Sequence, residues 1–494
     1  MHQPKDRHSQ TKAFHECYFA KLKKSRANIY GIAKLKSRLP TFLPRPKSFP
    51  SHVCSRLPYL PRETAALLDE PMEHAILAFN QEVRCLVAGE GYWNSAIVHL
   101  KKGDDVEFIS IDAFERTIIR PALDDGTESF QQKTNLILAI TTAKQILQGH
   151  AEGDCHYEYA LRIYGATSKP NAYFEEALFN LEDSMAVIPI NYTPMQLAHA
   201  TVRHSGMSQI ALLLSGRDGR VHMFLEDEST NQFREHDIAN YFPFLAKFKE
   251  VPSSILCFDI YEKYNTQIIT AGCQDGSVHL AVYTRSSERD NFCTETATHT
   301  IKTFGPVSSL NLFDPVTKLT SDASQVNLLV TFAIEEALIF HGVTINGLSK
   351  SVMLPQSTYH DSILCSHVLD FDYDGENEIF LGTYGRELLA YKRARGTSHK
   401  YSLLWKRTFA YPIYGITSLD LNLDGVDEVV VQTIFGVHIF QPNLENARSR
   451  LTDVLRYLEE VGKTKRELEL RQVQGKIGEG KKEEEAVEEE ASSV

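Results

Sequence analysis

Two short stretches of the chain place side-chain oxygen atoms at alternate positions. They read Asp-Phe-Asp-Tyr-Asp-Gly-Glu-Asn-Glu and Asp-Leu-Asn-Leu-Asp-Gly-Val-Asp-Glu, and the second begins 50 residues after the first. Calcium takes about six to eight oxygen ligands, which alternate residues of a turn can direct into one concavity. The pattern therefore predicts two candidate calcium loops. Their ligands would be Asp370, Asp372, Asp374 and Glu378 in the first loop, and Asp420, Asn422, Asp424 and Glu428 in the second.

Neither loop has the sequence of an EF-hand. That motif needs a bidentate glutamate at its twelfth position, where the chain has Leu381 in the first loop and Val431 in the second. An alternative is an Asx turn, in which the carboxylates accept hydrogen bonds from their own backbone and from water. Clustered carboxylates repel one another unless a cation or backbone N–H groups compensate them. The residues leave both interpretations open.

Motifs for catalysis are missing from the sequence. It has no P-loop, no Gly-x-Ser-x-Gly elbow, no His-Glu-x-x-His and no set of kinase motifs. His222 and His279 occupy matching places in two repeats, which indicates a repeated structural position. Asp370 and Asp420 imitate the carboxylate pair of a glycosidase, but each begins a loop in a separate repeat. We therefore expect no enzyme, and no cofactor other than calcium in the two loops.

The elements around these loops are short apolar runs separated by turns. Strand-rich units are expected at about residues 28–105, 106–170, 190–230, 250–290, 300–345, 360–395 and 410–441. Two of them share an Asp-Gly turn, which suits a tight hairpin because glycine adopts positive φ freely. Repeats built only of short strands are typical of propeller blades. The sequence thus predicts an all-β fold, a seven-bladed β-propeller over residues 26–441, closed by pairing an N-terminal strand with the last blade.

The flanking segments have a different composition. Residues 1–25 are predicted to be a basic, disordered extension, and residues 36–74 a loop or insertion rich in proline and lysine. Residues 1–60 carry 13 Lys and Arg against Asp6 and Glu16, so contact with an acidic surface such as a filament or anionic lipid is the alternative. Residues 442–474 have leucines at helical spacing, and residues 475–494 form an acidic tail predicted to be disordered. The helix would pack on its own propeller, stay solvated, or bind a partner.

Composition limits the classes of partner. The formal net charge of −12 argues against a general nucleic-acid binder, which would present a basic face. The eight cysteines include no Cys-x-x-Cys pair, which favours reduced thiols in the cytoplasm. No apolar run approaches the roughly 18 residues of a transmembrane segment, and the N-terminus lacks the apolar core of a secretory signal.

Several sequence segments together resemble those of the kaptin family. The strongest are residues 361–392 and 403–439, joined by EFISIDAF, NYTPMQLAHATV, LLLSGRDGRVHMF and AGCQDGSVHLAVY, whereas residues 36–84 match nothing in that family. The acidic loops are similar to the FG-GAP repeats of integrin α-chains, which are propeller blades with calcium loops. Integrin loops usually end in Asp, where this chain has Glu378 and Glu428.

The resemblance implies a function for the chain. Kaptin-like proteins are propeller subunits of the KICSTOR complex, which contains a second FG-GAP propeller subunit and a very large scaffold subunit. That complex lies on the lysosomal surface, recruits the GATOR complex, and represses TOR complex 1 when amino acids or glucose run short. The resemblance also implies an alternative, direct binding to actin filaments of the cytoskeleton in lamellipodia and stereocilia.

Overall fold

The structure is a computed structural model of the 494-residue chain. It describes residues 14–21, 26–38, 72–89, 92–103, 105–121, 130–147, 155–167, 174–181, 184–204, 207–227, 232–250, 253–287, 291–292, 294–315, 326–394, 400–422, 424–443, 445 and 448–463. Most of the predicted 36–74 insertion and all of the 475–494 tail lie outside these residues. The chain forms two compact units, Met1–Phe371 with Gly375–Pro442, and Asp372–Asp374 with Asn443–Val494.

Nearly all of the regular structure in the first unit is antiparallel β-sheet. Four separate sheets each contain four strands that follow one another in the chain. They are β10 (Pro194–His204), β11 (Met207–Gly216), β12 (Val221–Asp227) and β13 (Gln232–His236); β14 (Ile255–Lys263), β15 (Thr266–Cys273), β16 (Ser277–Thr284) and β17 (Thr294–Lys302); β18 (Val307–Phe313), β19 (Asn327–Phe332), β20 (Leu338–Phe340) and β21 (Ser351–Met353); β22 (Ile363–Leu369), β23 (Glu378–Thr383), β24 (Glu387–Arg393) and β25 (Tyr401–Thr408).

Two further sheets involve the N-terminal part of the chain. One has the order β1 (Phe14–Lys21), β28 (Gly436–Pro442), β27 (Glu428–Thr433) and β26 (Ile413–Leu419). The other has eight strands, in the order β5 (Tyr92–Val98), β4 (Val83–Gly89), β3 (Met72–Phe79), β2 (Ala27–Ser37), β6 (Val106–Pro121), β7 (Phe130–Leu147), β8 (Cys155–Thr167) and β9 (Ser184–Ile190). Its two halves are joined by one parallel pair, Tyr30 with Ser110.

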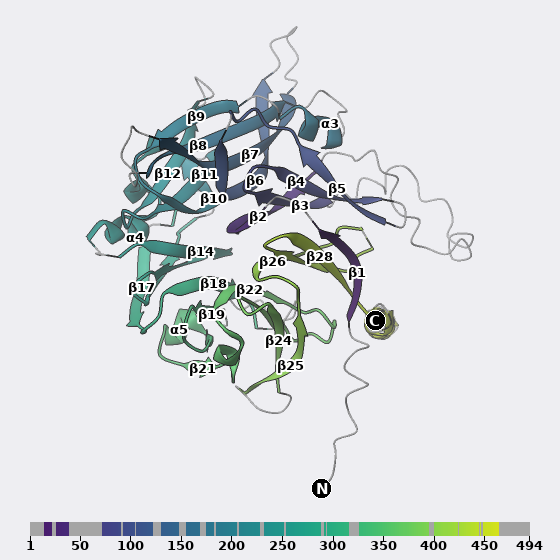
Figure 1. The fold of residues 1–494 in the computed structure, drawn as a ribbon. Helices are drawn as coiled ribbons and strands as arrows, with labels where there is room; N and C mark the ends of the chain where they lie inside the picture. The colour runs from purple at the N-terminus through teal and green to yellow at the C-terminus, as the bar shows by residue number, and fades with distance from the viewer. Residues whose placement is uncertain are drawn as a thin grey trace, which may run out of the picture. The chain divides into compact units, whose positions relative to one another are not determined.

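The sheets of this unit are arranged radially, with an inner strand of each near a common axis (Figure 1). These inner strands contact one another in the order β2, β6, β10, β14, β18, β22, β26 and back to β2. The all-β propeller is therefore confirmed. The prediction of seven separate blades is wrong: the described residues form five separate four-stranded blades and one eight-stranded sheet, because β2 and β6 come close enough to pair.

Closure of the ring depends on β1. This strand pairs antiparallel with β28 from Phe14 opposite Pro442 to Lys21 opposite Gly436. Glu16 fixes the contact, because it forms an ion pair with Arg407 and lies 2.6 Å from Nδ1 of His438. Pairing covers an edge that would otherwise be open to another chain. An N-terminal closing strand is as expected, but it covers Phe14–Lys21, which the sequence analysis placed in a disordered extension.

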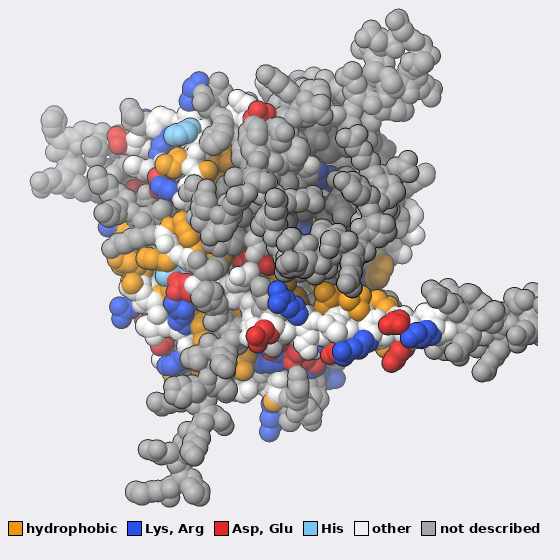
Figure 2. Space-filling model, turned by 90° about the vertical axis from the view of Figure 1, so that its right-hand side faces the viewer, with side chains coloured by type: hydrophobic (Ala, Val, Ile, Leu, Met, Phe, Trp, Pro, Cys, Tyr) orange, Lys and Arg blue, Asp and Glu red, His pale blue; other side chains and the backbone are white. Residues whose placement is uncertain are grey.

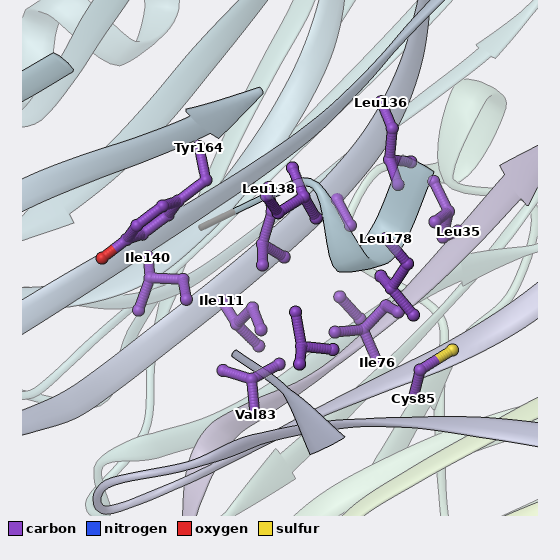
Figure 3. Packing of buried hydrophobic residues seen from close by; sticks show 14 of the residues in the cluster. Leu35, Ile76, Val83, Cys85, Ile111, Leu136, Leu138, Ile140, Tyr164 and Leu178 are labelled. Carbon is purple, nitrogen blue, oxygen red and sulfur yellow. The ribbon is translucent and has the colours of Figure 1, made fainter. Parts of the chain in front are cut away.

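Each blade is held by apolar side chains between neighbouring sheets. The central strands are buried along their whole length, as in β23 and β27, because other blades cover both faces. Figure 3 shows one such cluster, in which Ile76 and Val83 from one half of the eight-stranded sheet meet Ile111 and Ile140 from the other. Helix α3 (Phe174–Phe179) caps this cluster, and its Leu178 adds to the same core.

The second unit contains a helix over residues 448–463. Its large apolar side chains are all exposed; they are Leu451, Val454, Leu455, Tyr457, Leu458 and Val461. The remainder of the predicted helix, from residue 464 to 474, lies outside the described residues. Within the described ranges, no helix has the length and apolar character that crossing a membrane requires.

Candidate metal-binding loops and an apolar surface

The two acidic loops occupy the same place in neighbouring blades. Each connects the first strand of its blade to the second, β22 to β23 and β26 to β27, and these first strands contact each other. In both blades the last register pair before the loop joins a leucine to the loop's final glutamate: Leu369 with Glu378, and Leu419 with Glu428. The glutamate of each loop is therefore also the first residue of a buried strand.

Local backbone geometry explains the shared Asp-x-x-x-x-Gly spacing. Gly375 and Gly425 have φ angles of 93° and 85°, a region that glycine adopts without strain. Each glycine donates its N–H to the first aspartate of its loop, at 2.9 Å to Oδ2 of Asp370 and at 2.8 Å to Oδ2 of Asp420. The Asx turns of the alternative interpretation are also present, because the N–H of Asp374 donates to Asp372 and that of Asp424 to Asn422, each two residues back.

The first loop brings three carboxylates together. One oxygen from each of Asp370, Asp372 and Asp374 lies within 4.8 Å of the others. The N–H of Asp374 donates to Oδ1 of Asp372 at 3.2 Å. Glu378, the fourth predicted ligand, forms an ion pair with Lys392 on β24 instead. The four predicted ligands of this loop are therefore divided between a cluster of three carboxylates and a buried ion pair.

The second loop binds its own backbone more extensively. The N–H of Asp424 donates to Oδ1 of Asp420 at 3.1 Å and to Oδ1 of Asn422 at 2.9 Å. Asp424 in turn accepts the N–H of Val426 on Oδ1 at 3.0 Å and the amide of Asn422 on Oδ2 at 3.1 Å. Oδ1 of Asp420, Oδ1 of Asn422 and Oδ1 of Asp424 each accept one of these bonds and keep a second lone pair, so the bonds do not prevent metal ligation.

Burial strongly affects the charge of the second loop. The pKa of Glu428 is raised to about 9, first by burial and then by the neighbouring charges of Asp424 and Asp420. Burial also raises the pKa of Asp420 to about 6 and that of Asp424 above its usual range. The surroundings therefore disfavour the ionised carboxylates, and without a cation Glu428 is protonated at neutral pH. The loop's oxygen-only donors, three carboxylates and one amide, fit the chemistry of calcium.

The sequence did not reveal two residues that make the charge balance of the two loops different, Lys392 and Gln441. They occupy equivalent positions: Lys392 of β24 follows the partner of Ile379 in β23, and Gln441 of β28 follows the partner of Val429 in β27. Lys392 pairs with the buried glutamate of its loop, whereas Gln441 donates to Oδ2 of Asp424 at 3.2 Å. Aligning the third strands of the two repeats would have revealed the difference.

A second surface feature is a row of exposed apolar side chains, here called the apolar ridge: Phe304, Ile334, Tyr359 and Tyr384. They are exposed by 95%, 66%, 78% and 53%. The connections that carry them are joined by hydrogen bonds from one blade to the next. The N–H of Phe304 donates to Glu335, that of Ala337 to Ser357 at 3.0 Å, and that of Tyr384 to Ser362 at 2.8 Å.

Large exposed apolar patches mark interaction sites in soluble proteins. The ridge is therefore a candidate protein-binding surface. Among the described side chains on the face that Figure 2 presents, hydrophobic, basic and acidic residues are interspersed.

A groove of about 750 Å³ lies elsewhere, over β7, β8 and β9. Its lining includes Lys144, His156, Tyr157 and Arg162, and none of the loop or ridge residues. These side chains do not form a nucleophile with its base or a set of metal ligands. The groove offers contact area and no recognisable reaction chemistry.

Radial antiparallel sheets, closed by an N-terminal strand and carrying acidic loops between first and second strands, define a β-propeller protein. Comparison with known proteins then gives its family. The family model described as KICSTOR complex protein kaptin matches residues 103–452. The KICSTOR complex protein kaptin of Mus musculus is 32% identical over 362 residues, which cover 72% of this chain and 77% of the mouse protein. The chain belongs to the kaptin family.

Solved structures show more distant likeness. A crystal structure of BBS1N in complex with ARL6DN, soaked with mercury, has a TM-score of 0.43 and 10% identity, and covers 87% of this chain and 97% of that one. The same complex soaked with lead has a TM-score of 0.40 and 9% identity, and covers 75% of this chain and 88% of that one.

Proposed function

We propose that this protein is a non-enzymatic scaffold subunit of a KICSTOR-type complex. The observation that carries the proposal is the family match, which extends over residues 103–452 and includes the strands that support the apolar ridge. A propeller with broad faces and exposed apolar connections is suited to holding several partners at once. Linked binding raises the local concentration of one partner near another without any chemical step.

The partners follow from the family. The protein would pair with a second propeller subunit of the FG-GAP type and with a very large scaffold subunit, and the assembly would recruit the GATOR complex to the lysosomal surface. Its effect would be to repress TOR complex 1 when amino acids or glucose are scarce. The mouse relative is named as a KICSTOR complex protein, which supports the first part of this proposal.

Affinity purification of the tagged full-length protein from starved cells tests the assignment. Recovery of a second propeller protein together with a giant scaffold protein supports the KICSTOR-type role. Recovery of neither, from a preparation in which the tagged protein is folded, contradicts it.

Actin binding is the second candidate, and it rests on the basic N-terminal residues. Within the described part of that stretch, Lys34 and Lys36 already form ion pairs with Glu73, at 2.7 and 3.1 Å. This use of two lysines inside the fold favours the scaffold role. Pelleting with filaments at low and at physiological salt separates the two candidates, because purely electrostatic attraction disappears as salt is added.

A further inference from the structure

The two acidic loops compensate their buried glutamates in different ways. In the first loop, Glu378 is 1% exposed, and its Oε2 accepts the N–H of Phe371 at 2.7 Å. Lys392 of β24 pairs with the other oxygen, Oε1. The next residue of that strand, Arg393, pairs with Glu376 of the same loop. Two cations from one strand therefore neutralise two carboxylates of the first loop.

The second loop has no such cations on the corresponding strand. The register of the two sheets makes Gln441 and Pro442 of β28 the counterparts of Lys392 and Arg393. Gln441 is neutral and donates a side-chain amide N–H to Asp424, and the side chain of Pro442 has no hydrogen-bond donor. The strand that supplies positive charge in one blade supplies none in the next.

Glu428 is left with an unpartnered oxygen as a result. The residue is 0% exposed, and its Oε2 accepts the N–H of Leu421 at 2.9 Å, which places the carboxyl under the loop between Asp420 and Asn422. Its Oε1 is buried and has no hydrogen-bond partner among the described residues. Burying an ionised carboxylate oxygen without a donor or counter-ion is strongly unfavourable.

Other nearby cations are already engaged. Lys34 and Lys36 of β2 lie 2.7 and 3.1 Å from the two oxygens of Glu73. The two lysines therefore serve Glu73, and an ionised Glu428 needs another source of positive charge.

We propose that the Asp420–Glu428 loop binds one calcium ion and that, in the first loop, Lys392 has taken the place of this ion. The protein ligands would be oxygens of Asp420, Asn422 and Asp424 with Oε1 of Glu428, and water would complete the coordination. The closer grouping of Asp370, Asp372 and Asp374 does not change this assignment, because the first loop already contains its counter-ions.

Reciprocal exchange of the two strand residues tests the proposal in the full-length protein. After removal of metal with a chelator, calorimetric titration with calcium chloride should give one site per chain in the wild type. The affinity of such loops is expected on the order of 10⁻⁴ M. Gln441→Lys should weaken binding about tenfold or more, because an ammonium group then occupies the site. Lys392→Gln should add a second site.

Stability without calcium provides the second readout. Gln441→Lys should unfold at a higher temperature than the wild type in chelator, because the new ammonium pairs with Glu428. Should Gln441→Lys fail to fold, Asp424→Asn tests the same site by removing one charged ligand, and it should also weaken calcium binding. Absence of calcium binding by the wild type, or unchanged binding by Gln441→Lys and Asp424→Asn, would overturn the proposal.

Discussion

Removing Lys392 should destabilise the blade formed by β22–β25 more than any single surface ion pair does. The side chain of Lys392 is 13% exposed and that of its partner Glu378 is 1% exposed, so Lys392→Met leaves a buried carboxylate without its cation. Breaking a buried pair in this way costs about 3–5 kcal/mol. The neighbouring pair, Arg393 with Glu376, has side chains 29% and 30% exposed, so Arg393→Met should cost about 1 kcal/mol or less.

Denaturation in urea, with chelator present, measures this difference. Trp405 lies opposite Ala390 in the same blade, so its fluorescence in a Trp93→Phe background reports on the β22–β25 sheet. The double variant Lys392→Met with Glu378→Gln should recover most of the loss, because the buried charge is then absent. Equal losses for Lys392→Met and Arg393→Met, or no recovery in the double variant, would refute the reasoning.

Two further predictions concern closure of the ring and pH. Deletion of residues 1–21 removes β1 and should cause aggregation, detected by light scattering, whereas deletion of residues 1–13 should not; similar behaviour of both would argue against closure by β1. His74 is buried, stacks on Phe174 with ring centroids 3.7 Å apart, and has its pKa lowered to about 4 by burial. The unfolded chain takes up this proton near pH 6.5 and the folded chain only near pH 4. Lowering the pH from 6.5 to 4 should therefore decrease the free energy of unfolding by about 1.4 kcal/mol for each pH unit. His74→Phe should flatten this slope in urea titrations at pH 4–7, and identical slopes would count against a buried neutral histidine.

The parts of the fold that sequence reasoning predicted are those with a strong apolar signal. Strands such as β23 and β27 are buried on both faces, and their uninterrupted apolar runs mark them clearly. The outer strands gave no such signal. In β17 the side chains alternate between exposed and partly buried, and none is fully buried, so the strand reads as a polar linker. Outer strands are specified mainly by pairing with the strand inside them.

Closure and blade count depend on contacts between distant parts of the chain. β1 has a mixed sequence, and its place is determined by β28 and by the ion pair of Glu16 with Arg407, about 390 residues away. The junction of β2 with β6 is a single pair. Periodicity within a short window contains no information about either contact.

The acidic loops were predicted in position and residue type, but not in charge balance. All eight candidate ligands lie in the two loops expected, since the Asp-x-x-x-x-Gly spacing determines each turn. Which carboxylates need a cation depends on Lys392 and Gln441, two strands further along the chain in sequence and adjacent in space. Whether a metal binds remains a prediction for the experiments above.

The most direct test of the scaffold account compares two exposed isoleucines. Ile334 on the apolar ridge is 66% exposed, and Ile345 on helix α5 (Val343–Asn346), outside the ridge, is 71% exposed. Capture of the KICSTOR-type partners by tagged Ile334→Ser and Ile345→Ser, relative to wild type, should fall about tenfold for the first and stay unchanged for the second. Equal capture by both variants and the wild type would contradict binding through the ridge.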